Sequence, residues 1–597
     1  MPIYKAPLRD MKFAMQELFA SSEQPTLPGF ENLSEQDIEM ILAEAAKFCE
    51  NILFPLNLSG DTEGCHWENR EVKTPKGFKE AYKEFVNSGW ASLACEPEFG
   101  GQGLPETIAL AVEEMVCSSN LSFGLYPGLT RGAYQLLLKH GTDELKHHYL
   151  PKMVEGIWSG TMCLTEPHCG TDLGLVRTKA LPQSDGSYKI TGTKIFISSG
   201  EHDLTENIIH FVLARTPEAP AGIRGVSLFL VPKFLTTSNG EIEGRNSVYC
   251  DSIEHKMGLK GSATCVLNFE EATGWLVGTL YKGVANMFTM MNNERLAVGN
   301  QGLGIAEIAY QNALSYAKER LQGRSLTGIK HPEKAADPII VHPDVRKMLL
   351  TMKAYNEGNR MLGTWVSFYI ARSQKAENET EREEADEFVQ LMTPIVKAFM
   401  TDCGTDVASL GIQVYGGHGY IHEHGMEQYM RDARIAQIYE GTNGVQALDL
   451  VRRKLQTATG RYLRRFFHPV YNYIQEKQHD ESLAEFIAPL QKAFDRLQQA
   501  TISLAQRGLS NPNEMGAAAS DYLRMFALTA HAYLWAKACE VAYAKKEGHD
   551  KAFYESKIVT ARFFMQKILP QTSSLFACIM AGSKPLMEMK EEEFGPF

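Results

Sequence analysis

The sequence has few of the features that would place a protein in a class at once. Its eleven cysteines are scattered without a C-x-x-C pair, and only Cys163 and Cys169 lie close together. No uninterrupted apolar run approaches the roughly 20 residues that a membrane span requires. The cysteine pattern favours free thiols in a reducing compartment over a disulfide framework or a zinc site, so no metal is predicted.

Positive charge is also in short supply. The formal net charge is −12, which argues against non-specific nucleic-acid binding. One basic stretch, "GRYLRRFFHP" at 460–469, is interpreted as a solvated turn. The first twenty residues have no long apolar core and include Asp10 and Glu17, so neither a signal peptide nor a transit peptide is supported. We expect a cytoplasmic protein with no nucleic-acid partner and at most a peripheral membrane contact.

The remaining composition is that of a folded protein with several cores. Hydrophobic residues make up 44% and charged residues 22% of the 597 positions, which excludes a disordered or fibrous chain. A chain of this length favours three or four packed units over one. We find no internal repeat.

The hydrophobic period changes twice along the chain. "SEQDIEMILAEAAKFCENIL" from Ser34 begins with a serine cap and continues at helical spacing, and similar stretches extend to about residue 158. Short β-rich runs such as "GSYKITGTKIFISSG" and "GVSLFLVPKF" then predict a compact sheet or barrel. Helical periodicity resumes afterwards. The predicted domains are residues 1–159, 160–280, 281–455 and 456–597.

Two polar segments are expected to interrupt the later helices. "KAENETEREEADE" at 375–387 is interpreted as a solvated loop before a long helix from about 385 to 413. "RGLSNPNEMG" at 507–516 predicts a hairpin between two helices of the last segment.

Two loops have the equipment for holding a ligand. "MCLTEPHCGTD" at 162–172 places two threonine hydroxyls and backbone N–H groups on one loop, which suits a flavin edge or a phosphate. "QVYGGHGY" at 413–420 places paired glycines at a helix end, where backbone can approach a ligand closely. It is not a dinucleotide-binding fingerprint, because it follows a helix and not a strand. Alone, either stretch is more often an ordinary turn.

A single carboxylate interrupts the largely uncharged end of the stretch "RIAQIYEGTNGVQ" at 434–446. A lone glutamate at a helix end is usually a solvated surface acid. Glu440 could instead be placed there to accept a proton, and its immediate neighbours do not decide between these two interpretations.

The order and spacing of several motifs carry more information than any one of them. The stretches are "CLTEPHCGTD", "GTKIFISSG", "KMGLKGSATC", "NNERL", "YAKERLQGR", "QVYGGHGYIHEHGMEQYMRDARI" and "YEGT". Together they resemble the acyl-CoA dehydrogenase flavoprotein family over most of residues 30–455. The short opening segment and the helical tail are similar to its large bacterial branch, which includes 3-methylmercaptopropionyl-CoA and broad-range fatty acyl-CoA dehydrogenases.

The resemblance implies a fold and an assembly. The fold is mainly α with a central β-barrel: a helical N-terminal domain, the barrel, a four-helix bundle and here an extra C-terminal helical domain. FAD would lie between barrel and bundle, with its adenosine part reaching a second subunit. A homodimer or higher oligomer follows from that arrangement.

The resemblance also implies a reaction. The glutamate of the Y-E-G-T turn, Glu440 here, would remove the α-proton of an acyl-CoA while the β-hydrogen leaves as hydride to flavin N5, giving a trans-2-enoyl-CoA. In the family a flavin ribityl hydroxyl and the glutamate's own N–H polarise the thioester carbonyl. Burial and stacking should raise the pKa of the carboxylate. Electrons would pass to an electron-transferring flavoprotein, and the substrate would be a fatty acyl-CoA or 3-methylmercaptopropionyl-CoA.

A second glutamate is an alternative base. In some relatives the catalytic glutamate precedes an arginine in the first bundle helix, and this sequence has Glu294 before Arg295. Because the chain also has the Y-E-G-T turn, we assign Glu440 as base and interpret Glu294 as pairing or pocket lining. Arg295 and Asn292 resemble residues that help to bind the CoA substrate.

The resemblance assigns the FAD contacts position by position. They are Leu164, Thr165, Thr171, Phe196, Ser198, Arg320, Gln322, Gln413, Gly416, Gly417 and Thr442. Phe196 stands where many relatives have tryptophan and Ser198 where they have threonine, so stacking and a hydroxyl survive. Gly444 and Pro343 each replace a glutamine of relatives, which puts those two single contacts in doubt.

Two other functions are compatible with the same motifs. An acyl-CoA oxidase would use the same base and flavin but pass electrons to oxygen. A non-catalytic flavin-bearing, DNA-associated or scaffold protein could be built on the same fold, although the acidic net charge and the presence of Glu440 weigh against it.

Overall fold

The computed structural model describes residues 2–19, 30 and 33–595, and its elements fall into two units. The helical unit comprises Met1–Ile3, Pro7–Glu39 and Val298–Phe597, and the mixed unit comprises Tyr4–Ala6 and Met40–Ala297. The long helix α7 (Gly283–Glu319) contributes residues to both units. The finer division into four predicted domains stays a prediction.

The first half of the mixed unit is helical, as the periodicity predicts. Its helices are α3 (Pro55–Glu63), α4 (Phe78–Asn87), α5 (Glu106–His140) and α6 (Asp143–Val154), and a short hairpin pairs β1 (His66–Glu68) with β2 (Glu71–Lys73). Among the described residues one helix, α5, is long and apolar enough to cross a membrane, but 78% of the qualifying window is buried inside the protein. Its apolar residues therefore serve as core.

The second half of the mixed unit is a seven-stranded sheet with the order β3-β6-β7-β11-β5-β4, in which β10 also pairs with β11. The strands are β3 (Trp158–Cys163), β4 (Lys179–Pro182), β5 (Tyr188–Ser198), β6 (Asn207–Ala214), β7 (Ser227–Pro232), β10 (Val248–Ile253) and β11 (Thr264–Leu276). A small ribbon pairs β8 (Phe234–Thr236) with β9 (Ile242–Arg245).

The sheet curls back on itself. Residue Arg215, just after β6, exchanges backbone hydrogen bonds with Thr178 and Ala180 of the β4 segment, although β4 and β6 stand far apart in the strand order. Every residue of β6 is buried, including the polar Asn207 and His210, so both of its faces are covered. The predicted β unit between helical segments is thus confirmed.

The helical unit begins with the bundle helices. α8 (Pro343–Lys375) and α9 (Glu379–Tyr415) pack along each other, followed by α10 (Met426–Arg434) and α11 (Asn443–Asp449). The solvated connection predicted at 375–387 is present but much shorter: α8 ends at Lys375 and α9 begins at Glu379. Asn378 caps α9 by accepting from the N–H of Thr380 at 2.8 Å. Acidic residues in a first helical turn are favoured by the helix dipole, so the charged run extends the helix.

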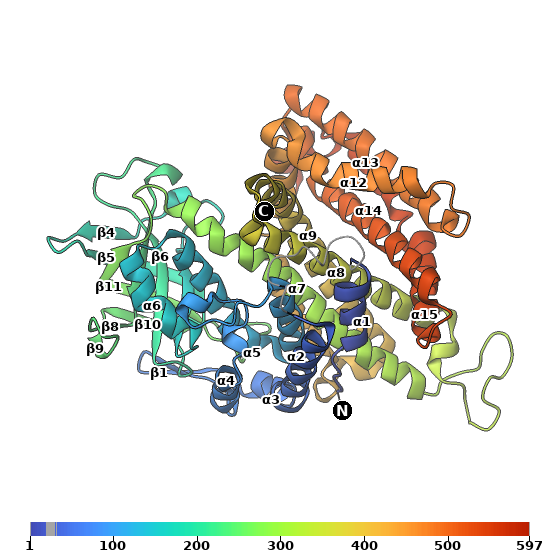
Figure 1. Cartoon of the computed structure of the whole chain (residues 1–597), viewed down its shortest axis with the longest axis horizontal. Helices are drawn as coiled ribbons and strands as arrows, with labels where there is room; N and C mark the ends of the chain where they lie inside the picture. The colour runs from blue at the N-terminus through green and yellow to red at the C-terminus, as the bar shows by residue number, and fades with distance from the viewer. Residues whose placement is uncertain (1, 20–29, 31–32, 596–597) are drawn as a thin grey trace. The chain divides into compact units, whose positions relative to one another are not determined.

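The tail consists of antiparallel helices, and Figure 1 shows α12, α13 and α14 side by side. They are α12 (Arg461–Lys477), α13 (Ala484–Ser510), α14 (Asn513–Lys545), α15 (Lys551–Phe563), α16 (Gln571–Ala581) and α17 (Lys584–Met587). The hairpin predicted between α13 and α14 is present. The solvated turn predicted at 460–469 is wrong, because α12 starts at Arg461, and Arg461 and Arg465 form ion pairs with the buried carboxylate of Glu387 on α9.

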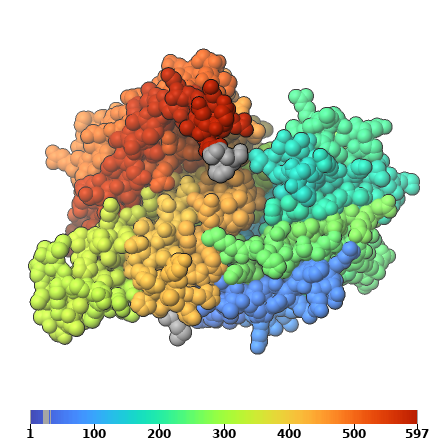
Figure 2. Space-filling view, turned by 180° about the vertical axis from the view of Figure 1, so that it is seen from behind, coloured from blue at the N-terminus to red at the C-terminus, as the bar shows by residue number. Residues whose placement is uncertain are grey.

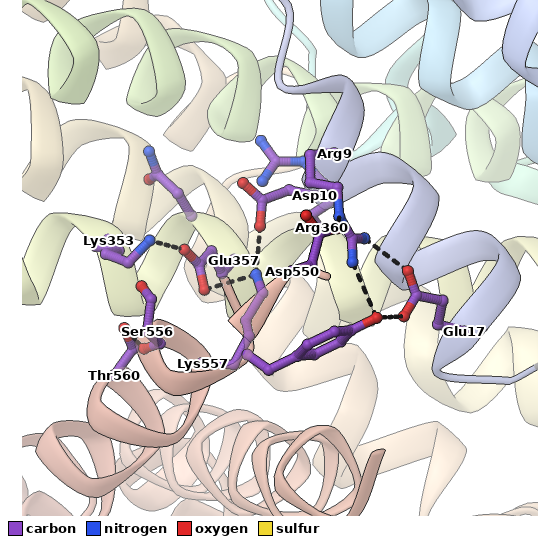
Figure 3. Close-up of polar contacts among 12 residues, drawn as sticks. Arg9, Asp10, Glu17, Lys353, Glu357, Arg360, Asp550, Ser556, Lys557 and Thr560 are labelled. Atoms are coloured by element: carbon purple, nitrogen blue, oxygen red, sulfur yellow. Dashed lines mark hydrogen bonds and ion pairs between the residues drawn. The ribbon is translucent and has the colours of Figure 1, made fainter. Parts of the chain in front are cut away.

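An ionic cluster ties the opening segment of the chain to α8 and α15 (Figure 3). Lys557, which is 2% exposed, pairs with Asp10 of α1 (Leu8–Lys12) and with Glu357 of α8, the latter at 2.8 Å. Arg9 donates to Glu17 at 2.6 Å and to Asp550 at 2.8 Å. These ion pairs therefore fix the opening segment within the helical unit.

Candidate active site

The predicted base sits in a strained turn between η11 (Ile435–Gln437) and α11. Glu440 is half-buried and has a φ of 57°, a left-handed conformation that is uncommon for a residue with a side chain. Gly441 follows with a φ of 84°, and Thr442 then caps α11 by accepting from the N–H of Val445 at 3.2 Å. A left-handed non-glycine residue costs of order 1–3 kcal/mol, so its surroundings must hold it in place.

Buried donors hold the two carbonyl groups of this turn. The side-chain amide of Gln446 donates to the carbonyl of Glu440 at 3.1 Å. The ammonium of Lys397, on α9, donates to the carbonyl of Gly441 at 2.8 Å and to the Oδ1 of Asn443 at 2.8 Å. Both Lys397 and Gln446 have no exposed surface.

Asp402 of α9 accepts hydrogen bonds from residues on both sides of the turn. Asp402 accepts from the side-chain amide of Gln437 at 2.7 Å and from that of Asn443 at 2.7 Å. The hydroxyl of Tyr439 donates to the side-chain oxygen of Gln301 on α7. The turn is therefore anchored to two bundle helices of the same unit.

The other predicted residues of the helical unit gather where α7 and α9 end. Tyr316 and Tyr415 stack with ring centroids 4.1 Å apart, which brings the two helix ends together. Near them lie five exposed residues: Gln413 in the last turn of α9, Gly416 and Gly417 directly after it, and Arg320 and Gln322 after α7. Figure 2 shows the yellow-green segment after α7 and the golden segment after α9 on the same face of this unit.

The backbone of Gly416 and Gly417 is exposed directly after α9. Gly416 has φ 60° and ψ −139°, a combination that glycine adopts without strain, and no atom lies within 4 Å of where a Cβ would stand on Gly416 or Gly417. His342, just before Pro343 at the start of α8, hydrogen-bonds the carbonyl of Gln322 at 2.8 Å. That contact holds the segment of Arg320 and Gln322 although Pro343 has replaced a glutamine.

In the mixed unit, a buried ion pair fixes the hydroxyl-bearing loop. Glu166 accepts from the ammonium of Lys194 at 2.8 Å and from the Oγ1 of Thr178 at 2.6 Å, while Lys194 also donates to the carbonyl of Leu164 at 3.0 Å. Burial opposes ionisation of Glu166, but these partners outweigh it and lower its pKa. Thr165 stays half-buried and Thr171 exposed, so their hydroxyls lie at the surface of a rigid loop.

Phe196 is displayed by an irregularity in β5. Its side chain is 58% exposed and its φ is 58°, while the next residue, Ile197, is buried. The pairing of β5 with β11 shifts register between Cys265 and Leu267, opposite this point. Such bulges re-aim side chains. Ser198 follows, half-buried, at the end of the strand.

Glu294 and Arg295 are both buried on α7, with exposed fractions of 5% and 8%. A Cβ on Gly132 of α5 would lie 2.2 Å from the carboxylate of Glu294, so this glycine leaves room for it. Arg131 is the next residue of α5, and burial lowers its pKa while the charge of Glu294 works in the opposite direction. Arg295 donates to Asn292 at 3.3 Å.

A cavity opens beside α5. It is lined by both halves of α5 and by the segment 85–95, including Trp90, Leu93, Val112, Gly124, Gly128 and Arg131. No atom lies within 4 Å of where a Cβ would stand on Gly128. Its walls are mainly apolar, with a charged group at Arg131 that also pairs with Glu113 at 3.3 Å.

Taken unit by unit, these features are of the kinds that hold separate parts of a flavin dinucleotide. An exposed aromatic ring at Phe196 can stack on a planar ring system, and the rigid loop at Thr165 and Thr171 offers hydroxyls. The open backbone at Gly416 and Gly417 admits a phosphate or ribose closely.

The sequence did not single out the groups that hold the site together. Lys397, Asp402, Asn443 and Gln446 around Glu440, and the Glu166–Lys194 pair, were not predicted. A signal did exist for Lys397, because it is the one cation in the apolar stretch "LMTPIVKAFM" of a helix. A buried position is costly for a cation unless it has hydrogen-bond partners.

Comparison with known proteins assigns consecutive parts of the chain. Family models match in order: "Acyl-CoA dehydrogenase, N-terminal domain" at 35–157, "middle domain" at 161–272, "C-terminal domain" at 281–455, and "Acetyl-CoA dehydrogenase C-terminal like" at 466–590.

Whole-length relatives and a solved structure agree with these matches. The chain is 44% identical to a 3-methylmercaptopropionyl-CoA dehydrogenase of Ruegeria pomeroyi, over 96% of this chain and 97% of the relative. It is 32% identical to a broad-specificity linear acyl-CoA dehydrogenase of Mycobacterium tuberculosis, over 99% and 100%. A Bacillus anthracis acyl-CoA dehydrogenase complexed with FAD has a similar fold, with a TM-score of 0.73 at 21% identity over 95% and 92%.

Proposed function

The chain belongs to the acyl-CoA dehydrogenase family, and from this premise we propose that Glu440 is the base that removes the α-proton of its acyl-CoA substrate. The family, the fold class, the enzyme class and the cofactor FAD that the motifs predicted are confirmed. The roles of single residues stay predictions.

The observation that supports this role is the held, left-handed turn at Glu440. An α-proton of a thioester is far too weakly acidic for a carboxylate in water, so the base must be placed precisely and kept from solvation. The turn is strained, yet donors from α9 and α11 fix the carbonyls of Glu440 and Gly441. A conformation maintained at such cost is expected where a side chain must point in one direction.

The turn at Glu440 also carries a backbone hydrogen-bond donor. The peptide N–H of Glu440 is the group that, by the family resemblance, donates to the thioester carbonyl in the reaction. A donor fixed before the reaction stabilises the charge that develops on that oxygen without reorganisation. The carboxylate and the N–H belong to one residue, so the anchors that hold the turn align both.

The residues assigned to FAD are divided between the two units. Leu164, Thr165, Thr171, Phe196 and Ser198 belong to the mixed unit, and Arg320, Gln322, Gln413, Gly416, Gly417 and Thr442 belong to the helical unit. When bound, FAD supplies the acceptor for the β-hydrogen of the substrate. Arg320, Gln322 and the glycine pair would serve the FAD of a second subunit, and a homodimer is part of this proposal.

Glu294 is the weaker candidate for the base. It lies on a regular helix, packs against Gly132 and has a buried arginine, Arg131, as an electrostatic partner. A nearby cation stabilises the ionised carboxylate and makes it a poorer proton acceptor. We therefore propose that Glu294 shapes the pocket and that Arg295, with Asn292, binds the CoA part.

The cavity beside α5 is the proposed place for the far end of the acyl group. Its apolar wall at Leu93 and Val112 suits an alkyl chain or a thioether, and the bare Gly128 leaves it open. Similarity to a 3-methylmercaptopropionyl-CoA dehydrogenase and to a broad-specificity linear enzyme supports unbranched acyl groups of either kind.

An anaerobic titration tests the base and the substrate together. The yellow holoprotein is mixed with acyl-CoAs from short to long and with 3-methylmercaptopropionyl-CoA while the flavin absorbance is followed. Glu440→Gln should slow bleaching by about 10³-fold, whereas the matched variant Glu294→Gln should keep most of it. The opposite ranking would make Glu294 the base.

The electron acceptor is a separate matter. We propose an electron-transferring flavoprotein, and an acyl-CoA oxidase is the competing function. Oxygen consumption with substrate alone would identify an oxidase, while turnover that needs an added electron-transferring flavoprotein supports the dehydrogenase. Bleaching by no acyl-CoA at all would instead favour the non-catalytic scaffold.

A further inference from the structure

The buried lysine of α9 has an unusual position for a charged residue. Lys397 has no exposed surface and lies in the middle of a long helix, on a stretch that is otherwise apolar. Its ammonium reaches the carbonyl of Gly441 and the Oδ1 of Asn443, both at 2.8 Å. Burying an ammonium in this way costs free energy, so the hydrogen bonds that it makes must offset that cost.

Two oxygens that Lys397 contacts belong to the turn directly after Glu440. The peptide group is planar, so fixing one carbonyl oxygen fixes the whole plane between two Cα atoms. Gln446 donates to the carbonyl in the plane that joins Glu440 to Gly441, at 3.1 Å. The carbonyl of the next plane accepts from Lys397 at 2.8 Å and, at a longer 3.4 Å, from Gln446. Two fixed planes in succession determine φ and ψ of Gly441, and the first of them is also the peptide plane on the C-terminal side of Glu440.

We propose that Lys397 is a positioning residue for the base, acting through the backbone of Gly441 and the side chain of Asn443. The inference rests on the proposed role of Glu440. Without the ammonium, the strained turn would relax toward conformations in which the carboxylate and the N–H of Glu440 no longer point together at one place.

The choice of lysine follows from its chemistry. Hydrogen bonds from an ammonium are shorter and stronger than those from a neutral donor, and a lysine has three donors on a flexible stem. One side chain can therefore reach two oxygens of a turn that lies 44 and 46 positions further along the chain. A neutral side chain of this length and donor count does not occur among the natural amino acids.

The test compares Lys397→Met with the wild-type holoprotein. The methionine keeps most of the volume of the stem but removes the donors. We expect kcat to fall by about 10²-fold, the magnitude associated with misplacing a catalytic group by a small distance. KM, bound FAD per chain and the melting temperature should stay close to wild type. A kcat within twofold of wild type overturns the proposal.

A second background separates positioning of Glu440 from a general structural role. If Lys397 acts through Glu440, then adding Lys397→Met to Glu440→Gln should slow bleaching little further, because the group being positioned is already gone. A loss that multiplies in the double variant overturns the proposal while leaving Glu440 as base. Wild-type bleaching in Glu440→Gln itself would instead overturn the proposed function.

A milder variant covers the case in which Lys397→Met does not fold. Lys397→Gln retains an uncharged amide with two N–H donors on a shorter stem. It should lose less of kcat than the methionine variant while shifting the pH profile of flavin bleaching. A folded glutamine variant with wild-type kcat and pH profile would overturn the proposal.

Discussion

Among the described residues of the helical unit, two lysines are buried, and they have different partners. Lys557 lies between two carboxylates, Asp10 and Glu357, and joins the opening segment to α8 and α15. Lys397 donates to a backbone carbonyl and a side-chain amide of a strained turn. We infer different roles from these partners. Lys557 joins distant segments through ion pairs with their carboxylates, whereas Lys397 orients a strained turn through hydrogen bonds to its oxygens.

The largest expected effect comes from removing Lys557. Lys557→Met leaves Glu357, which is 4% exposed, without one of its cationic partners, and breaking a buried ion pair from one side costs about 3–5 kcal/mol. Urea unfolding should show that loss. The comparison predicts that kcat of the folded fraction stays within about twofold of wild type, since Lys557 does not touch the turn of Glu440.

The matched variant for this measurement is Lys397→Met, which should show the reverse pattern. It is expected to have a lower kcat and nearly unchanged unfolding. If the two methionine variants lost stability and kcat in the same proportion, the distinction between the roles of Lys557 and Lys397 would be wrong.

The second effect is a pH dependence at the ionic cluster of Lys557, which includes Asp10. Burial opposes ionisation of Asp10, but Lys557, Arg360 and Lys353 outweigh it and lower its pKa from 3.8 to about 2. A depressed pKa contributes stability that is fully present above pH 3.8 and is lost as pH falls toward 2. At about 1.4 kcal/mol per unit of pKa, the contribution at neutral pH is roughly 2 kcal/mol.

Asp10→Asn makes this prediction measurable. Its free energy of unfolding should be lower than that of wild type by roughly 2 kcal/mol at neutral pH. The two curves should converge as pH falls below 3.8. Parallel curves from pH 6 to pH 2 would show that Asp10 does not provide this acid sensitivity.

Periodicity and motif order predicted the large features because these depend on local or repeated signals. The change from helical to β spacing near residue 160 and the hairpin between α13 and α14 both leave a mark in short windows of sequence. The motifs identified the family because their order is read directly from the chain. These features are confirmed.

Two predictions failed, one of them in part, for a shared reason. The acidic run at 375–387 and the basic run at 460–469 each looked like a solvated segment when considered alone. In the structure they meet, since Arg465 donates to Glu387 at 2.8 Å across 78 positions, and most of each run is helix. Charges of opposite sign far apart in sequence can satisfy each other, and no local window contains that information.

The anchors of Glu440 escaped prediction for the same physical reason. The Y-E-G-T letters mark the turn, but nothing in them indicates that Lys397, Asp402 and Gln446 supply its donors and acceptors. Those contacts depend on how α9 passes the turn in three dimensions. The resemblance supplied the candidate base, and the packing of the helical unit supplied an account of what holds it.

The smallest predicted effect is that of Gln446→Leu, which tests whether the charge of Lys397 matters for kcat. Gln446 is a neutral donor to the same turn, since its amide donates to the carbonyl of Glu440 at 3.1 Å, and it has no exposed surface. Gln446→Leu removes that donor with little change of volume. A neutral hydrogen bond contributes about 0.5–1.5 kcal/mol, so kcat should fall by up to about tenfold, less than for Lys397→Met.

Stopped-flow bleaching of the flavin by one saturating acyl-CoA measures both variants on the same scale. Asn378→Ala, which removes a cap at the far end of α9, serves as the control for a general loosening of that helix and should leave the bleaching rate unchanged. If Gln446→Leu were as slow as Lys397→Met, the charge on the lysine would have no special part in holding the turn. A tenfold gap between them would show that an ammonium is needed because its bonds must overcome the strain at Glu440.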